Sequence, residues 1–305
     1  MVNAIETQSI TKKYGKKVVV NHVSLNIPNG SVYGLVGENG SGKTTIMRLI
    51  TGLAIPTSGK YSLFGISCDD KKIYKAKEKL AAIVETPSLI PTMNAYDNLK
   101  YAAGYLGISI NEDRINEILS LVGLNNVEKK LVKNFSLGMR QRLGIGLCLL
   151  NDPKMLILDE PMNGLDPEGI VEIRELILKL NHEQNITFII SSHILGELGK
   201  VATKYGFIHQ GRLIEEVTQE ELENKCQKSL ELKVSNLDEC VNILYNIGYT
   251  ELKVINNHVI ILGDYDIEKI VISLAQNNIK IISIKSNEEG IEEYYLRLMG
   301  GLRHA

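Results

Sequence analysis

The sequence contains no long hydrophobic run. Its longest apolar stretch, residues 143–150, has eight residues and includes two glycines. A membrane-spanning helix needs about 20 consecutive apolar residues, so none is predicted. The N-terminal Met-Val-Asn-Ala leads directly into ordinary sequence, without the basic and apolar segments of a secretory leader. We therefore expect a soluble, intracellular protein.

Cysteine is scarce, and the four cysteines are scattered: Cys68, Cys148, Cys226 and Cys240. They form no CxxC pair and have no histidine nearby at the spacing of metal ligands. Disulfide frameworks and structural zinc sites both depend on clustered cysteines. The four are therefore interpreted as reduced thiols.

Neither sign of charge dominates, because 34 Lys and Arg oppose 36 Asp and Glu. A nucleic-acid-binding protein normally presents a clustered basic face, so no nucleic-acid partner is expected. Residues 216–305 are nevertheless acidic on balance, whereas the preceding residues are basic on balance. Together with the length of 305 residues, this asymmetry favours two domains with different roles.

Short apolar strands alternate with helical segments in the first two thirds of the chain. Strand-like runs occupy residues 31–37, 79–85, 155–159 and 187–191, each followed by a loop and a helix. This alternation predicts an α/β domain with a mostly parallel sheet. Residues 94–126 are polar and helix-rich and contain no strand of their own. We therefore predict a helical insertion over about residues 91–133.

The last part of the chain follows a different pattern. After residue 228 the expected order of elements is β-α-β-β-α-β, which is that of a ferredoxin-like α+β unit. A capping box at residues 218–221 predicts a short helix at the start of this domain. The predicted domains are thus residues 1–217 and 218–305. The acids Glu215 and Glu216, with those at 220, 221 and 223, are interpreted as a solvated helix face.

A glycine-rich segment between a predicted strand and a predicted helix matches the phosphate-binding P-loop pattern G-x-x-x-x-G-K-[ST]. The backbone N–H groups of such a loop surround a phosphate, and the lysine adds a positive charge beside the β- and γ-phosphates. The hydroxyl of Thr44 is placed to bind Mg²⁺. A chance glycine loop is the alternative. The residues expected to bind nucleotide here are Gly37, Glu38, Asn39, Gly40, Ser41, Gly42, Lys43, Thr44 and Thr45.

An apolar strand at residues 155–159 ends in two acids, Asp159 and Glu160. Downstream of a P-loop, Asp159 is interpreted as a ligand of Mg²⁺, held directly or through water. Glu160 is the candidate general base that polarises the attacking water. A charged pair that merely ends a strand is the alternative.

Four further motifs accompany these two. Residues 135–143 read Phe-Ser-Leu-Gly-Met-Arg-Gln-Arg-Leu, residues 163–166 read Asn-Gly-Leu-Asp, residues 191–193 read Ser-Ser-His, and Tyr14 precedes the P-loop by 23 residues. Their order and spacing over residues 4–217 resemble those of the ATP-binding-cassette (ABC) proteins. The motifs resemble, in turn, the signature sequence, the D-loop, the switch histidine and the aromatic residue that stacks on adenine. Taken singly, a histidine at a strand end or a tyrosine is more often structural.

The resemblance implies a fold and a mechanism. The fold is a P-loop ABC ATPase cassette with antiparallel N-terminal strands, and its cofactors are ATP and Mg²⁺. Each ATP site is completed by the signature loop of a second cassette, so Ser136 and Gly138 contact the nucleotide of a partner copy. Asp166, in the D-loop, is also expected to bind nucleotide. His193 stabilises the γ-phosphate and the water. The expected assembly is a homodimer that encloses two ATP molecules.

The sequence departs from the commonest ABC pattern at three positions. Glu85 replaces the glutamine that usually ends the strand before the helical insertion, and it is expected to sense Mg²⁺ as a carboxylate. Leu137 and Met139 replace the second-position glycine and the glutamine of the signature. These departures resemble the ATPase subunits of bacitracin-resistance and lantibiotic self-protection exporters. The C-terminal extension is similar to the bacitracin type.

This sub-family resemblance implies a peripheral ATPase on the cytoplasmic face of the membrane. It would power a separate transmembrane permease that exports a peptide antibiotic. Residues 91–105, together with Glu85, are expected to receive the cytoplasmic coupling helices of the permease. Export of another cargo, a soluble ABC protein of translation or DNA maintenance, and a sensory role for the C-terminal domain are the alternatives.

Overall fold

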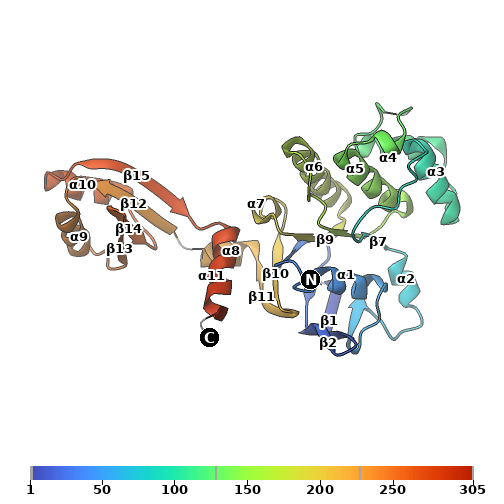
Figure 1. The fold of residues 1–305 in the computed structure, drawn as a ribbon, viewed down its shortest axis with the longest axis horizontal. Helices are drawn as coiled ribbons and strands as arrows, with labels where there is room; N and C mark the ends of the chain where they lie inside the picture. Colours follow the sequence, from blue (N-terminus) through green and yellow to red (C-terminus); the bar gives the residue numbers. More distant parts are fainter. Residues whose placement is uncertain (1–2, 128, 227, 304–305) are drawn as a thin grey trace. The chain divides into compact units, whose positions relative to one another are not determined.

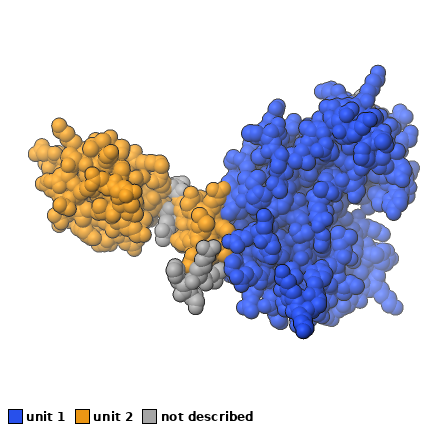
Figure 2. All heavy atoms as spheres, viewed as in Figure 1, with its two compact units in different colours: residues 1–219 blue, residues 220–305 orange. Residues whose placement is uncertain are grey.

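The computed structural model describes residues 3–127, 129–226 and 228–303. The chain divides into two compact units, residues 1–219 and 220–305, which Figure 2 shows in different colours. The division falls close to the boundary expected after residue 217. Met1 and Val2, the first residues of the segment in which a secretory leader was not expected, lie outside the described residues.

A six-stranded, mostly parallel sheet forms the centre of the first unit. Its strands lie in the order β11-β10-β4-β9-β8-β7, and only β11 runs antiparallel to its neighbour. Every residue of β4, β8 and β9 is buried, as expected for parallel strands that are covered on both faces. The α/β prediction is therefore confirmed. The strands are β4 (Val32–Val36), β7 (Leu80–Ile83), β8 (Met155–Asp159), β9 (Thr187–Ser192), β10 (Lys204–His209) and β11 (Arg212–Thr218).

A second, antiparallel sheet is built mainly from the N-terminal strands. It comprises β1 (Asn3–Tyr14), β2 (Lys17–Val23), β3 (Asn26–Pro28), β5 (Ser58–Leu63) and β6 (Ile66–Ser67). Helix α1 (Lys43–Thr51) contacts β2 of this sheet and β8 of the parallel sheet. Its apolar residues Ile46, Met47 and Ile50 share one core with residues of both sheets. The two sheets therefore hold α1, and the loop before it, in a fixed position.

The predicted helical insertion contains two helices with well-formed caps. The side chain of Asn94 accepts a hydrogen bond from the Asp97 N–H at 2.8 Å, and Asn111 accepts one from the Arg114 N–H at 2.9 Å. The two helices of the insertion are α3 (Ala95–Tyr105) and α4 (Glu112–Leu121), and the first unit also contains α2 (Ile73–Lys77), α5 (Leu137–Cys148) and α6 (Pro167–Gln184), with 3₁₀ turns at Val132–Asn134 and Leu149–Asn151. Figure 1 shows α3 to α6 gathered on one side of the parallel sheet. In the part of the chain that the structure describes, no helix has the length and apolar character of a membrane span.

The second unit has the predicted ferredoxin-like order. Its four antiparallel strands lie in the order β13-β14-β12-β15. Leu230 and Ile261, paired on neighbouring strands, share a core with Cys240 of α9 and Ile270 of α10. The elements are β12 (Lys228–Val234), α9 (Leu237–Asn246), β13 (Leu252–Ile255), β14 (His258–Leu262), α10 (Ile267–Gln276) and β15 (Ile281–Glu288), flanked by α8 (Gln219–Lys225) and α11 (Ile291–Arg303).

The interpretation of Glu216 as part of a solvated helix face is wrong. Glu216 lies on β11, and its side chain is only 16% exposed. Its carboxylate accepts hydrogen bonds from the Tyr33 hydroxyl at 2.9 Å and from the Asn26 N–H at 3.0 Å, and it forms a 3.0 Å ion pair with Lys204. Burial first, and then the charge of Glu216, raise the pKa of Tyr33 well above its ordinary value. The acid thus joins strands β3, β4, β10 and β11.

Candidate active site

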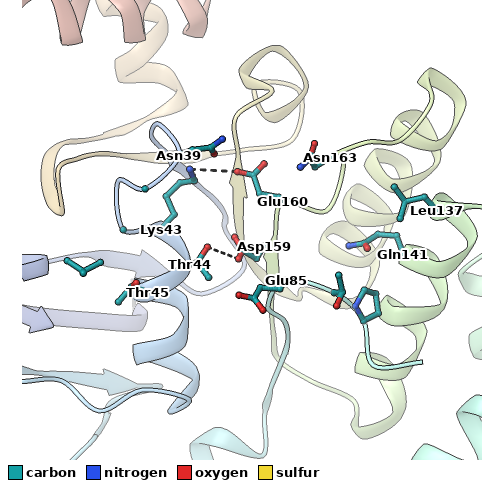
Figure 3. A pocket seen from close by; sticks show the side chains of 15 residues that line it. Asn39, Lys43, Thr44, Thr45, Glu85, Leu137, Gln141, Asp159, Glu160 and Asn163 are labelled. Atoms are coloured by element: carbon teal, nitrogen blue, oxygen red, sulfur yellow. Dashed lines mark hydrogen bonds and ion pairs between the residues drawn. The ribbon is translucent and has the colours of Figure 1, made fainter. Parts of the chain in front are cut away.

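A pocket of about 460 Å³ opens in the first unit, where the loops that follow β4, β7 and β8 meet. Parallel sheets bind ligands at such carboxyl ends of their strands. Figure 3 shows its lining, in which Lys43 and Thr44 face the acidic residues Asp159 and Glu160 at the end of β8. The residues that line it are Val19, Asn39, Gly40, Gly42, Lys43, Thr44, Thr45, Glu85, Thr86, Pro87, Leu137, Gln141, Asp159, Glu160 and Asn163.

The P-loop leads directly from the buried strand β4 into α1. Gly42 precedes the helix with a φ of 111°, which an L-residue rarely adopts. A Cβ atom at this position would also lie 2.9 Å from the Val19 carbonyl oxygen. Glycine at 42 therefore allows the loop to turn sharply and to present the N-terminus of α1 to the pocket, which is the backbone arrangement that binds phosphate.

Lys43 is almost completely buried, yet its ammonium group reaches the pocket. Its Nζ donates hydrogen bonds to the carbonyl oxygens of Gly37 at 2.7 Å and Glu38 at 3.2 Å. Across the pocket, Nζ lies 3.7 Å from Oε1 of Glu160. The loop thus holds its own cation in place, and Glu160 is the anion that faces it.

Hydrogen bonds among the side chains of Thr44, Asp159 and Ser191 fix the end of β8. The Thr44 hydroxyl donates to Oδ2 of Asp159 at 2.8 Å, and the Ser191 hydroxyl donates to Oδ1 of the same residue at 2.6 Å. The Ser191 hydroxyl also accepts a hydrogen bond from the backbone N–H of Glu160 at 2.9 Å. Since Ser191 is fully buried on β9, the neighbouring strand determines where both acids lie.

The two candidate catalytic residues are in direct contact. Nδ1 of His193 lies 2.7 Å from Oε2 of Glu160, and the His193 backbone N–H donates to the same oxygen at 3.2 Å. Glu160 has a φ of 50°, in the left-handed region that side chains other than those of glycine rarely adopt. Such a backbone conformation persists where the surroundings determine it, and it is found repeatedly at functional sites.

Ser41 carries a buried hydroxyl that the rest of the described chain leaves without a hydrogen-bond partner. It lies in the P-loop, where a Cβ atom on Gly37 would come within 2.5 Å of its oxygen. A buried polar atom of this kind is unfavourable unless something supplies the missing partner. An anionic ligand of the loop would accept its hydrogen bond, so the residues present fit a phosphate group.

Glu85 does not end a strand as expected, because β7 stops at Ile83. It lies in the following loop with a φ of 73°, and its carboxylate forms an ion pair with Arg48 of α1. The sequence analysis did not identify Arg48. Its spacing from Thr44, four residues along the same helix, was the available signal, since such residues share one helix face.

Several predicted nucleotide contacts lie outside this pocket. Tyr14 is 48% exposed at the end of β1, with the Lys12 ammonium 5.0 Å from its ring centre. Ser136 caps α5 by accepting a hydrogen bond from the Met139 N–H at 3.2 Å, and Asp166 caps α6 by accepting one from the Gly169 N–H at 3.1 Å. Ser136 and Gly138 therefore stay predicted contacts of a nucleotide bound by another copy, Tyr14 stays a predicted contact of adenine, and Asp166 stays a predicted nucleotide-binding residue.

Two comparisons of the sequence identify its family. The family model described as ABC transporter matches residues 20–163. The chain is also 38% identical over 303 residues to the bacitracin transport ATP-binding protein BcrA of Enterococcus faecalis, which covers 99% of this chain and 98% of that relative. It belongs to the ABC transporter ATP-binding proteins. This membership confirms the prediction that the protein is an ABC-type ATPase and that its cofactor is a nucleotide.

Two further similarities agree with this membership. The lantibiotic transport ATP-binding protein SrtF of Streptococcus pyogenes is 46% identical over 220 residues, which cover 72% of this chain and 93% of that relative. Among solved structures, cbiO1 from Clostridium perfringens, part of the ABC transporter complex cbiONQ, superposes with a TM-score of 0.65 at 26% identity. That match covers 73% of this chain and 91% of cbiO1. The ABC cassette fold is therefore confirmed.

Proposed function

We propose that the chain hydrolyses ATP to power a separate membrane permease that exports a peptide antibiotic of the bacitracin or lantibiotic type. The observation that carries this proposal is the similarity to BcrA, which extends over 99% of the chain and therefore includes the ferredoxin-like unit. SrtF, a lantibiotic transport protein, supports the same class of cargo over a shorter stretch. Both cargoes are peptides.

The P-loop is proposed to bind the phosphates of ATP. Backbone N–H groups at the start of α1 and the Ser41 hydroxyl donate to the phosphate oxygens, and Lys43 adds a buried positive charge. The triphosphate is a stronger anionic partner for Lys43 than a single carboxylate. Nucleotide binding therefore releases Oε1 of Glu160, 3.7 Å from the lysine, to act on water.

The proposed Mg²⁺ ligands are the hydroxyl of Thr44 and the carboxylates of Asp159 and Glu85, which all line the pocket. Oxygen atoms are the ligands that Mg²⁺ prefers, and it commonly takes one or two carboxylates together with substrate phosphates. When bound, the ion neutralises charge that develops on the phosphates. The 2.8 Å hydrogen bond between Thr44 and Asp159 keeps these two oxygens together.

Glu160 is proposed to accept the proton of the water that attacks the γ-phosphate. His193 positions the carboxylate, because its Nδ1 and its backbone N–H both contact Oε2. The left-handed backbone of Glu160 and the hydrogen bond from its N–H to Ser191 fix the base relative to β9. The other carboxylate oxygen is then the one available to the water.

A second copy of the chain is proposed to complete each site. Ser136 and Gly138, at the N-terminus of α5, lie outside the chain's own pocket, and the exposed Ser136 is available to the nucleotide held by a partner. Asp166 and Tyr14 are exposed and are proposed to contact the partner and the adenine, respectively. Two cassettes would then enclose two ATP molecules, and hydrolysis would separate them.

A cavity of about 1490 Å³ beside α3 and α5 is proposed to receive cytoplasmic segments of the permease. Tyr101, Tyr105 and Leu106 contribute exposed apolar surface to it, and each is more than half exposed. Thr86 and Pro87 line both this cavity and the nucleotide pocket. The cassette would thus lie peripherally at the cytoplasmic face of the membrane, with residues 1–217 as its ATPase domain and 218–305 as an accessory domain.

Drug susceptibility tests this proposal. Cells that express the chain with its neighbouring membrane genes are compared with cells that express the Glu160→Gln variant, across bacitracin, several lantibiotics and unrelated drugs. We expect protection against one peptide class only, and we expect the variant to abolish it. Protection against no peptide, despite ATP hydrolysis by the purified chain, would refute the cargo and leave the ATPase assignment intact.

A further inference from the structure

Helix α5 contains three consecutive polar residues, of which the first and third form side-chain hydrogen bonds and the second does not. Arg140 donates to the Phe135 carbonyl at 2.6 Å, and Arg142 donates to the Gly123 carbonyl at 2.8 Å. Gln141, between them, is only 7% exposed, and no hydrogen bond joins its amide to any described residue. Its amide atoms are not sealed inside the protein, so they are open to whatever occupies the pocket that Gln141 lines.

The amide of Gln141 is directed into the nucleotide pocket. Gln141 belongs to the pocket lining, and Figure 3 shows its amide pointing toward Asp159 from the wall opposite Lys43 and Thr44. Three carboxylates, those of Glu85, Asp159 and Glu160, also line this pocket. An amide both donates and accepts hydrogen bonds, and it adds no charge beside these acids.

Close backbone packing fixes Gln141 relative to the Glu85 loop. Gly144 lies three residues further along α5, on the same face of the helix. A Cβ atom on Gly144 would lie 2.6 Å from Cβ of Pro87 and 3.1 Å from Cδ1 of Ile83. The helix backbone therefore rests on the end of β7 and on the loop that contains Glu85. The backbone of Gln141 therefore stays at the pocket wall as long as α5 rests on this loop.

The same helix begins at the signature. Ser136, its N-cap, is exposed outside the pocket, whereas Gln141 is buried inside it. The two positions are five apart, which corresponds to about 7.5 Å along the helix axis. One short rigid segment thus connects the chain's own nucleotide pocket to the group that is proposed to contact the partner's nucleotide.

We propose that Gln141 is a positioning residue that holds the signature helix according to the contents of the chain's own pocket. With ATP bound, its amide N–H donates to the Glu85 carboxylate and its carbonyl accepts from water beside the nucleotide. These bonds fix α5, and with it Ser136, in the orientation that the partner's nucleotide requires. This inference rests on the proposed nucleotide site and dimer.

The decisive variant is Gln141→Met, which keeps the length and volume of the side chain and removes its hydrogen bonds. We expect ATP affinity within about twofold of the wild type, because the P-loop is unchanged, and kcat lower by about tenfold, because orientation is lost. In the Glu160→Gln background, more ATP should be needed to form the dimer. Gln184→Met, at the exposed end of α6, is the matched control and should change neither quantity.

A second variant separates hydrogen bonding from packing. Gln141→Glu keeps the shape but replaces the donor with an acceptor beside Glu85, so kcat should fall and the Mg²⁺ concentration for half-maximal activity should rise. Wild-type kcat and wild-type ATP-driven dimerisation in both variants would overturn the proposal. Failure of the unmodified chain to bind ATP would instead refute the nucleotide site itself.

Discussion

The guanidinium of Arg48 forms an ion pair with the carboxylate of Glu85 at the edge of the nucleotide pocket. Arg48 belongs to α1, which begins at the P-loop, whereas Glu85 belongs to the loop that leads toward the helical insertion. The pair therefore connects the phosphate-binding helix to the insertion. It also supplies the positive charge that balances a carboxylate where most ABC proteins have a neutral glutamine.

The first prediction concerns this charge balance. Arg48→Ala leaves the Glu85 carboxylate unpaired beside the triphosphate, so the KM for MgATP should rise several-fold. The pair is partly exposed, so its loss should change the free energy of unfolding by only about 0–1 kcal/mol. Adding Glu85→Gln to Arg48→Ala should restore the KM, as steady-state ATPase assays would reveal. A KM that stays raised in the double variant would show that Arg48 acts independently of Glu85.

The second prediction concerns the general base. Glu160→Gln should bind ATP normally and reduce kcat by about 10²–10⁴-fold, the usual contribution of general acid–base catalysis. Because hydrolysis is proposed to separate the two copies, this variant should accumulate as an ATP-bound dimer, measured by size-exclusion chromatography with light scattering. Hydrolysis at the wild-type rate would assign the base to another residue.

The third prediction concerns Lys43. Lys43→Ala removes the buried cation that the Gly37 and Glu38 carbonyls hold in the pocket, so the affinity for ATP should fall markedly in equilibrium binding experiments. Lys60→Ala, at an exposed lysine of β5, is the control and should bind ATP as the wild type does. Equal affinity in Lys43→Ala and the wild type would remove the P-loop from nucleotide binding.

The fourth prediction concerns the network around Glu216. Glu216→Ala leaves the buried Tyr33 hydroxyl and the Lys204 ammonium without their shared acceptor, which should lower the free energy of unfolding by about 1–3 kcal/mol. Urea denaturation measures the change. Glu220→Ala, at an exposed position four residues further along, should have little effect. Similar losses in both variants would show that the network does not stabilise the fold.

The fifth prediction is a dependence on pH. Burial, and then Glu216, raise the pKa of Tyr33 in the folded chain, so the folded state keeps its proton at a pH where the unfolded state loses it. The folded state therefore loses relative stability as the pH rises above about 10, the ordinary pKa of tyrosine. In urea titrations at pH 9 to 11, measured against pH 8, the wild type should lose stability more steeply than Tyr33→Phe. Parallel slopes would contradict the assignment.

The sequence predicted the parts of the site that depend on short, ordered motifs. Lys43, Thr44, Asp159 and Glu160 were placed together because strand-loop-helix patterns bring P-loop residues to the carboxyl ends of parallel strands. The ferredoxin-like unit followed from hydrophobic periodicity in the same way. These features are local in sequence, or they follow from the topology of the sheet.

Features that depend on side-chain packing could not be predicted. Arg48 contacts Glu85, and Gln141 enters the pocket, because α1, β7 and α5 meet in three dimensions. Glu216 was assigned to a helix because acids follow it in the sequence, whereas β11 directs it toward Tyr33 and Lys204. In each case the partner lies far away along the chain, and local patterns contain no information about it.

Thr86 and Pro87 form a wall with the nucleotide pocket on one side and the larger cavity beside α3 on the other. Because the same two residues line both cavities, a shift of Thr86 and Pro87 caused by a ligand in one cavity also changes the shape of the other. If the proposed permease docks in this cavity, thermodynamic linkage makes the effect reciprocal: the factor by which nucleotide changes the affinity for the permease is the factor by which the permease changes the affinity for nucleotide. An antibiotic that alters how the permease sits on the cassette would therefore change ATP binding without touching the cassette itself.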